Sequence, residues 1–171
     1  MNFLDLARDV IDLRSFSSIW YWIALAVMWS TLSNWVMGVP SDMIVRARRG
    51  DAQSEAAIRV LAEIFVNRTL GIVEASGTVM VGVTGFVLSA LGLLGFLYGI
   101  ELCQALFLLI LPMNLVALIS AIVARNLRTE GYENLTERLR WFRFKVQMLG
   151  AAFILLTALW GMWVNVNTTY F

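Results

Sequence analysis

Few side chains in this chain could take part in chemistry, and the sharpest candidates are polar residues inside apolar stretches. The sequence contains no histidine and a single cysteine, Cys103, which removes the commonest ligands of zinc, haem and iron–sulfur clusters. Glu74 lies inside an apolar stretch, where a carboxylate is costly and usually faces protein or water. It either forms an ion or proton site, or pairs with Arg68 or with an arginine of a neighbouring helix.

A second candidate is the middle of the third apolar stretch, which contains Pro112 and Asn114. Proline removes a backbone hydrogen bond and kinks the helix. The kink and the amide either line a polar pathway or form a packing bend, in which Asn114 bonds Thr84 or Ser89. The sequence contains no Walker loop, HExxH motif, CxxC motif or catalytic triad. We therefore expect no enzymatic activity, no metal site and no cofactor.

The elements that position these residues are long apolar helices. Hydrophobic residues make up 60% of the chain and charged residues 15%, with a mean hydropathy of +0.75. A spanning helix needs about 20 apolar residues, and four stretches qualify, at about 18–39, 70–94, 97–124 and 146–166. The sequence therefore predicts an all-α membrane protein, a single domain over 1–171 built as an antiparallel bundle of four transmembrane helices.

The connections between these stretches are short or helical. The second and third stretches are joined almost without a loop, and the junction contains Gly92, Gly95 and Gly99. These glycines predict a tight turn and an antiparallel hairpin. Segment 40–69 is expected to form two helices separated at Gly50 and Asp51. The second of them has no breaker before the membrane, so it can run straight into the second stretch.

Arginine predicts the orientation of the bundle. Eleven of the thirteen basic residues fall in segments 40–69 and 125–145, and the other two lie near the N-terminus. The positive-inside rule places both segments in the cytoplasm. We therefore expect a multi-pass protein of the bacterial inner membrane with both termini periplasmic. Trp20, Tyr21, Trp22, Trp160 and Trp163 lie at the predicted outer ends of their helices, as aromatic residues at the membrane–water interface do.

Two segments have the composition of membrane-surface elements. Residues 1–16 combine an apolar stripe with a charged face, which predicts an amphipathic interfacial helix or a helix docked on the bundle itself. A basic segment with an aromatic residue, made of Arg138, Arg140, Trp141, Arg143 and Lys145, is either a patch for anionic lipid headgroups or a plain topology signal. The net charge of +1 gives no argument for binding nucleic acid.

The most regular pattern in the chain is a stripe of small residues along the second stretch. Steps of four and three residues separate Gly71, Ala75, Thr78, Gly82, Gly85, Ser89 and Gly92. Helices associate in lipid through close packing, which small residues permit. The stripe therefore predicts a helix-packing face, which receives a helix of the same chain, a second copy or a larger complex. The fourth stretch has small residues at a less regular spacing, including Gly150, Ala151, Ala158 and Gly161.

These features favour a non-enzymatic integral membrane subunit or scaffold. Its expected partners are the lipid bilayer and either further copies of itself or other membrane subunits. The alternative is an oligomeric ion channel or small transporter that uses Glu74, Asn114 and the hydroxyl groups of the first stretch. A transport function requires that these groups converge on one water-filled cavity.

Four stretches of the sequence are distinctive: IDLRSFSSIWYWIALAVMWST at 11–31, GVPSDM at 38–43, ALGLLGFLYG at 90–99 and ALWGMW at 158–163. On these stretches the chain resembles a family of small four-helix bacterial inner-membrane proteins. Some members are labelled as a component of the Suf iron–sulfur assembly complex. The resemblance implies a four-helix membrane fold over nearly the whole chain. It implies no site residues, because the family has no motif with an assigned role.

Overall fold

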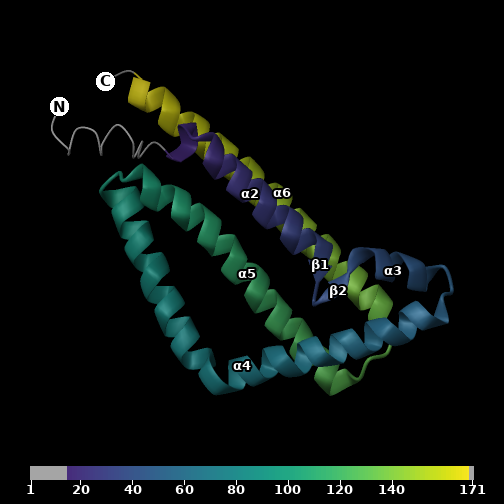
Figure 1. Cartoon of the computed structure of the whole chain (residues 1–171). Coiled ribbons are helices and arrows are strands. Elements are labelled where there is room, and N and C mark those ends of the chain that lie inside the picture. Colours follow the sequence, from purple (N-terminus) through teal and green to yellow (C-terminus); the bar gives the residue numbers. More distant parts are fainter. Residues whose placement is uncertain (1–14, 170–171) are drawn as a thin grey trace, which may run out of the picture.

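A computed structural model gives the fold of the chain and describes residues 15–169 (Figure 1). The elements in chain order are the 3-10 helix η1 (Ser15–Ser17), α2 (Ile19–Asn34), β1 (Trp35–Val36), β2 (Val39–Pro40), α3 (Ser41–Arg48), α4 (Ala52–Gly92), the π-helical segment η2 (Leu93–Leu97), α5 (Glu101–Glu130) and α6 (Leu135–Thr169). The predicted interfacial helix over residues 1–16 lies almost entirely outside the described residues.

Long apolar helices dominate the structure, in agreement with the predicted membrane class. Three segments of the described chain are long and apolar enough to cross a membrane, namely Ala52–Leu97, Glu101–Glu130 and Leu135–Val166. α2, where the first span is predicted, has 16 residues. At 1.5 Å per residue it is about 24 Å long, against about 30 Å for the hydrocarbon core of a bilayer. The structure therefore shows a helical protein with three candidate spans.

The helix in the first apolar stretch stops at Asn34, short of the predicted end at residue 39, because the chain reverses in a tight hairpin. β1 and β2 pair antiparallel, which leaves Met37 and Gly38 as a two-residue turn. Both residues have positive φ, 50° and 75°, as a type I′ turn requires. A Cβ on Gly38 would also come within 3.1 Å of the Phe65 ring. The residues of the hairpin are apolar, so the apolar stretch continues past Asn34 and hydropathy alone does not indicate the turn.

α4 begins with an aspartate cap. The Asp51 carboxylate accepts a hydrogen bond from the backbone N–H of Gln53 at 3.2 Å and another from the Ser54 hydroxyl at 2.5 Å. The bond from Ser54 is the main reason why the pKa of the Asp51 carboxyl lies below its ordinary value, since hydrogen bonds to a carboxylate favour the charged form. The cap satisfies backbone donors that a helix start otherwise leaves without partners.

From this cap α4 runs for 41 residues without a break, so the second helix of segment 40–69 does continue into the second apolar stretch. Figure 1 shows that α4 changes direction near its middle. Within α4 the Ser76 hydroxyl donates to the carbonyl of Ile72 at 3.0 Å. The first half of α4 lies across one end of the molecule, and the second half runs along α5 (Figure 1).

The predicted hairpin between the second and third stretches is confirmed. η2 and a short turn reverse the chain between α4 and α5, with Gly99 at a φ of 71°. Gly95 permits the closest approach, because a Cβ there would lie 2.8 Å from the backbone nitrogen of Gln104. α5 then returns antiparallel to the second half of α4 (Figure 1). At the other end of α5 a turn through Asn134 leads into α6.

The main core lies where α2, α3, α5 and α6 converge on the first half of α4. Its most deeply buried members are Val39, Ile58, Ala62, Val66, Ala124, Leu127, Leu139 and Val146. α4 contributes every fourth residue from Ser54 to Leu70, which is one face of a helix. Past Leu70 the described structure of α4 contains no buried residue. The two halves of α4 therefore differ: the first is anchored in the core, and the second contacts α5.

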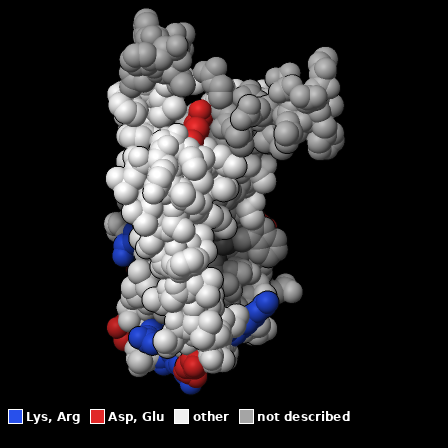
Figure 2. Space-filling model, turned by 90° about the vertical axis from the view of Figure 1, so that its left-hand side faces the viewer, with Lys and Arg blue, Asp and Glu red and all other residues white. Residues whose placement is uncertain are grey.

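The charges gather at the end of the molecule that holds this core. Figure 2 shows most of the blue and red atoms at the lower end, a blue group at about mid-height on the left edge, a band without charge above it, and an acidic group near the upper end. The lower end is formed by α3, the first half of α4 and the link from α5 to α6 (Figure 1). Segments 40–69 and 125–145 thus lie on the same side, as the predicted topology requires. η1 and the end of α6 lie at the opposite end (Figure 1).

Candidate functional site

The small-residue face of α4 consists of Gly71, Ala75, Thr78, Gly82, Gly85, Ser89 and Gly92. A Cβ on Gly71, Gly82 or Gly85 would meet nothing within 4 Å in the described structure. Ala75, Thr78 and Ser89 are exposed. Gly92, the last of the seven, lies 3.6 Å from the Phe107 ring of α5, measured from such a Cβ. Apart from this last residue, no helix of the described chain covers the face.

The small-residue face points away from α5 because of its position on the helix. Thr84 and Leu88 are partly buried on the half of α4 that packs along α5. Gly85 and Ser89 follow them by one residue, which is a rotation of about 100° around an α-helix. At the hairpin end, Ser89 and Gly92 line an apolar groove together with Phe107 of α5. The face is therefore a continuous open strip that ends in a groove.

The glycines of α6 have a different environment from those of α4. A Cβ on Gly150 would lie 2.7 Å from the Trp29 ring of α2, and one on Gly161 would lie 3.2 Å from the Phe16 ring. Gly150 and Gly161 are eleven residues apart, which is about three helical turns, so they share one side of α6. These two glycines form the close contact between α6 and the segment of η1 and α2. Their less regular spacing gave a weaker sequence signal than the stripe on α4.

Glu74 forms an ion pair with an arginine of the neighbouring helix. Its Oε1 lies 3.1 Å from Nη1 of Arg128, near the end of α5, and both side chains are more than half exposed. This is the second of the two predicted alternatives, with Arg128 rather than Arg68 as the partner. An exposed pair of this kind contributes at most about 1 kcal/mol to stability.

Asn114 bonds its own helix. Its Nδ2 donates to the carbonyl of Ile110 at 2.8 Å, one turn back along α5. The predicted bond to Thr84 or Ser89 is thus replaced by a local one. Fourteen residues of α5, or about 21 Å, separate Asn114 from Arg128, the partner of Glu74. The structure therefore does not bring Glu74 and Asn114 together.

The basic segment of α6 is divided between two sides of the helix. Arg138, Trp141 and Lys145 follow one another at steps of three and four residues and line a groove against α5. Arg140 lines a different groove, which is shared with Arg48 of α3. Arg143 is partly buried, and its Nε lacks a hydrogen-bond partner in the described structure. The predicted patch is thus two separate surfaces.

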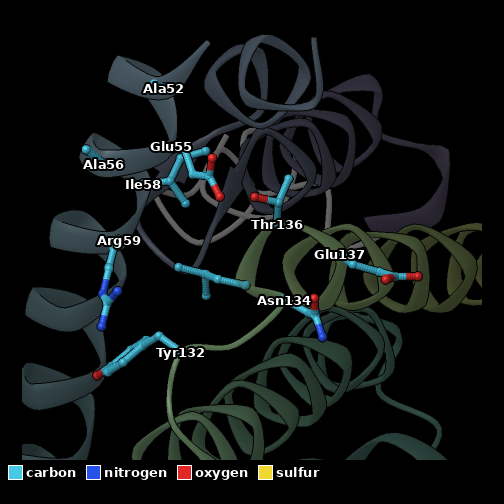
Figure 3. Close-up of a pocket in the computed structure, with 10 residues that line it drawn as sticks. Ala52, Glu55, Ala56, Ile58, Arg59, Tyr132, Asn134, Thr136 and Glu137 are labelled. Carbon is cyan, nitrogen blue, oxygen red and sulfur yellow. The ribbon is translucent and has the colours of Figure 1, made fainter. Parts of the chain in front are cut away.

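A third groove lies between the start of α4 and the start of α6 and has a volume of 560 Å³ (Figure 3). Glu55 and Thr136 face its interior, whereas Glu137 points away from Glu55 (Figure 3). Burial raises the pKa of Tyr132, and the charge of Glu63 adds to the shift. The described residues contain no group of three or more His, Cys, Asp or Glu that could hold a metal ion. The groove is a polar surface feature at the charged end.

Sequence reasoning missed a polar cluster at the opposite end, centred on Gln104. The Gln104 side chain donates to the carbonyl of Gly95 at 2.8 Å and accepts a bond from the Trp160 indole at 3.0 Å. Next to it, Glu101 accepts a bond from the backbone N–H of Phe16 at 2.6 Å. These bonds tie η1, η2, α5 and α6 together. The available signals were a carboxylate and an amide, Glu101 and Gln104, at the start of a run of apolar residues.

Protein-family models, curated proteins and solved structures give no match. The resemblance to small four-helix bacterial inner-membrane proteins therefore stays a prediction, and no site residue is transferred from a relative. The function has to be inferred from the chain itself, and its most distinctive surface is the small-residue face of α4.

Proposed function

We propose that this chain is a non-enzymatic integral membrane subunit that associates through the small-residue face of α4. The observation that carries the proposal is the empty space beside Gly71, Gly82 and Gly85, where a Cβ would meet nothing within 4 Å in the described structure. Each glycine in a helix interior costs about 1 kcal/mol relative to alanine. These three glycines gain no packing within the described chain. A partner helix whose backbone packs closely against them would offset this cost.

The proposed subunit crosses the bacterial inner membrane four times, with both termini periplasmic. α2 serves as the first span in this arrangement. Support comes from its position beside α6, a candidate span: Trp29 contacts Gly150, and Ser17 donates a hydrogen bond to Asn165 at 2.8 Å. The gathering of the Arg-rich segments at one end supports cytoplasmic placement of that end.

The proposed partner is a second copy of the chain or another membrane protein. Two variants separate the face from the rest of α4. Gly82→Leu with Gly85→Leu places bulky side chains on the face, whereas Val83→Leu changes an exposed neighbour about 100° away. After extraction in a mild detergent, we expect the double variant to lose the partner seen with the wild type and Val83→Leu to keep it. A wild type that elutes as a monomer with no partner would overturn the proposal.

Cysteine cross-linking in native membranes distinguishes the two kinds of partner. The background is Cys103→Ser, which removes the single native thiol. A cysteine at Gly82 should form a disulfide-linked dimer if a second copy packs on the face, whereas a cysteine at Val83 should not. Equal cross-linking at both positions would indicate random collision rather than a defined interface. Co-purification without cross-linking would assign the face to a different protein.

The channel alternative lacks a specific observation in its favour. Transport requires Glu74 and Asn114 to meet in one cavity, but Glu74 is paired with Arg128 and Asn114 bonds the carbonyl of Ile110. A flux assay in liposomes tests this directly. Flux in the wild type that is abolished by Glu74→Gln would favour transport over the subunit proposal.

A further inference from the structure

The groove between α5 and α6 has an ordered arrangement of charge that suits a particular ligand. We call it the α5–α6 groove; it has a volume of 420 Å³ and is lined, among others, by Val123, Asn126 and Glu130 of α5 and by Arg138, Trp141 and Lys145 of α6. This volume lies within the usual range for ligand sites, about 300–1,000 Å³.

The charges of the α5–α6 groove are arranged along its length. α5 and α6 run antiparallel (Figure 1), and the ion pair between Arg138 and Glu130, at 2.7 Å, fixes their register at the outer end. Glu137 also lines this outer end. Lys145 lies seven residues further along α6, about 10 Å toward the apolar band. At its outer end the groove therefore presents the Glu130–Arg138 pair and Glu137, whose Oε1 lies 3.9 Å from Nη2 of Arg140. At its inner end it presents the ammonium group of Lys145.

The inner end of the groove coincides with the boundary of the apolar band. Lys145 is the last charged residue of α6, and the rest of that helix contains none. In the described structure Lys145 is exposed and has no carboxylate within 4 Å. Trp141, one turn further out, is 53% exposed, and tryptophan favours the headgroup level of a bilayer. Val123 of α5 forms an apolar part of the groove wall at the same level along the groove as Lys145.

A glycerophospholipid carries its charges in the matching order. Its acyl chains lie in the apolar band, its phosphodiester anion lies at the boundary, and its terminal headgroup extends outward. We propose that the α5–α6 groove binds a phospholipid whose headgroup ends in a primary amine, as in phosphatidylethanolamine. Lys145 holds the phosphate through a charge-assisted hydrogen bond. Glu137 and Glu130 accept hydrogen bonds from the ammonium group.

The balance of charge selects this headgroup over others. Arg138 and Lys145 contribute two positive charges to the groove, and Glu130 and Glu137 contribute two negative charges. A headgroup with no net charge matches this balance, whereas an anionic headgroup adds a negative charge beside Glu130 and Glu137 without adding a positive one. A choline headgroup has no N–H to donate, so it leaves the carboxylates without a hydrogen bond from the lipid. The site is independent of the α4 face and of its proposed partner.

Native mass spectrometry of the purified full chain tests the site by counting single bound lipids. The probes are phosphatidylethanolamine, phosphatidylcholine and phosphatidylglycerol with identical acyl chains, added after delipidation. We expect the ethanolamine lipid to bind the wild type best and Lys145→Gln to weaken it about tenfold, the size typical of a lost hydrogen bond to a charged group. Arg49→Gln, which removes an exposed cation that follows α3 and does not line this groove, should leave binding unchanged.

A second variant tests the headgroup assignment separately. Glu137→Gln keeps the size of the side chain and removes its charge, so it should bring binding of the ethanolamine lipid down to that of the choline lipid. Three results would overturn the proposal: tighter binding of phosphatidylglycerol than of phosphatidylethanolamine, equal wild-type binding of the ethanolamine and choline lipids, or unchanged binding in Lys145→Gln. A thermal melt of each variant shows whether it is folded, and both substituted positions are exposed.

Discussion

The glycines of α6 and those of α4 occupy helices of similar composition but opposite surroundings. Gly150 and Gly161 of α6 are buried beneath the rings of Trp29 and Phe16. Gly82, in the second half of α4, is exposed, and a Cβ there would meet nothing within 4 Å in the described structure. The glycines of α6, whose spacing is less regular, are therefore the ones that pack against other parts of the same chain.

This difference shows that a small-residue pattern indicates close packing without indicating which molecule provides the partner. On α6 an aromatic ring fills the space that each glycine leaves, so these glycines belong to the fold of the single chain. On α4 the space is open, and the regular spacing over the second half of the helix suits a long straight partner. The two sets of glycines should consequently respond to substitution in opposite ways.

The largest effect is expected for Gly150→Ala. The new Cβ would lie 2.7 Å from a ring carbon of Trp29, which is itself buried, so the ring or α2 has to move. Overpacking of this kind costs about 1–3 kcal/mol. Thermal unfolding in detergent should show a clear loss of stability, and a smaller one for Gly161→Ala, whose Cβ has 3.2 Å to the Phe16 ring. Unchanged stability in Gly150→Ala would break the contrast with α4.

Gly82→Ala should have a smaller effect, of the opposite sign. Gly82 lies in a helix, and a Cβ there has open space around it. Alanine should therefore stabilise the isolated chain by about 0.4–1 kcal/mol, because it lowers the conformational entropy of the unfolded chain. The same substitution should weaken association, because it separates the two helix backbones. The stability of the monomer and the strength of association should both be measured on this one variant. A loss of monomer stability would show that the chain itself covers this face.

Glu74→Gln should change stability by less than about 1 kcal/mol, since its partner Arg128 and Glu74 itself are both more than half exposed. Arg128→Gln is the matched variant, and the double variant should show whether the two effects are coupled. A loss well above this limit would indicate that the second half of α4 is held to α5 by this ion pair as well as by apolar contacts.

The smallest effect concerns pH and the two halves of α4. The pKa of Asp51 is lowered in the folded chain, mainly by the Ser54 hydroxyl. Its stabilising contribution is therefore complete above the ordinary pKa of 3.8 and is lost as the pH falls through the lowered value. Amide hydrogen exchange corrected for pH should show loosening of the first turn after Asp51 in acid, with no change around Gly82. Asp51→Asn should remove this difference.

The sequence was sufficient for the features that depend on hydropathy, charge and strong turn residues. The hairpin at Gly95 and Gly99, the gathering of both basic segments at one end and the continuity of α4 all follow from such patterns. An arginine partner for Glu74 on a neighbouring helix was one of two predicted alternatives. Its identity as Arg128 depends on the register of α4 against α5, which hydropathy does not determine.

The remaining features depend on contacts between segments. The end of α2 at Asn34 is set by a turn whose Met37 and Gly38 need positive φ, and apolar neighbours conceal that need. The division of the basic segment follows from helical rotation, which places Arg140 on the other side from Arg138 and Lys145. The partners of Gln104 come from two other segments of the chain, η2 and α6, so no local pattern reveals them.

The core at the charged end has a consequence for the order of events during synthesis. Leu139 and Val146, both fully buried, complete this core from α6, whereas the anchored half of α4 ends at Leu70. Chains are made from the N-terminus, so α4 leaves the ribosome dozens of residues before the part of its anchor that α6 supplies. The open strip from Gly71 to Gly92 is thus available to a neighbour while the nascent chain is still incomplete, and assembly can begin before folding ends.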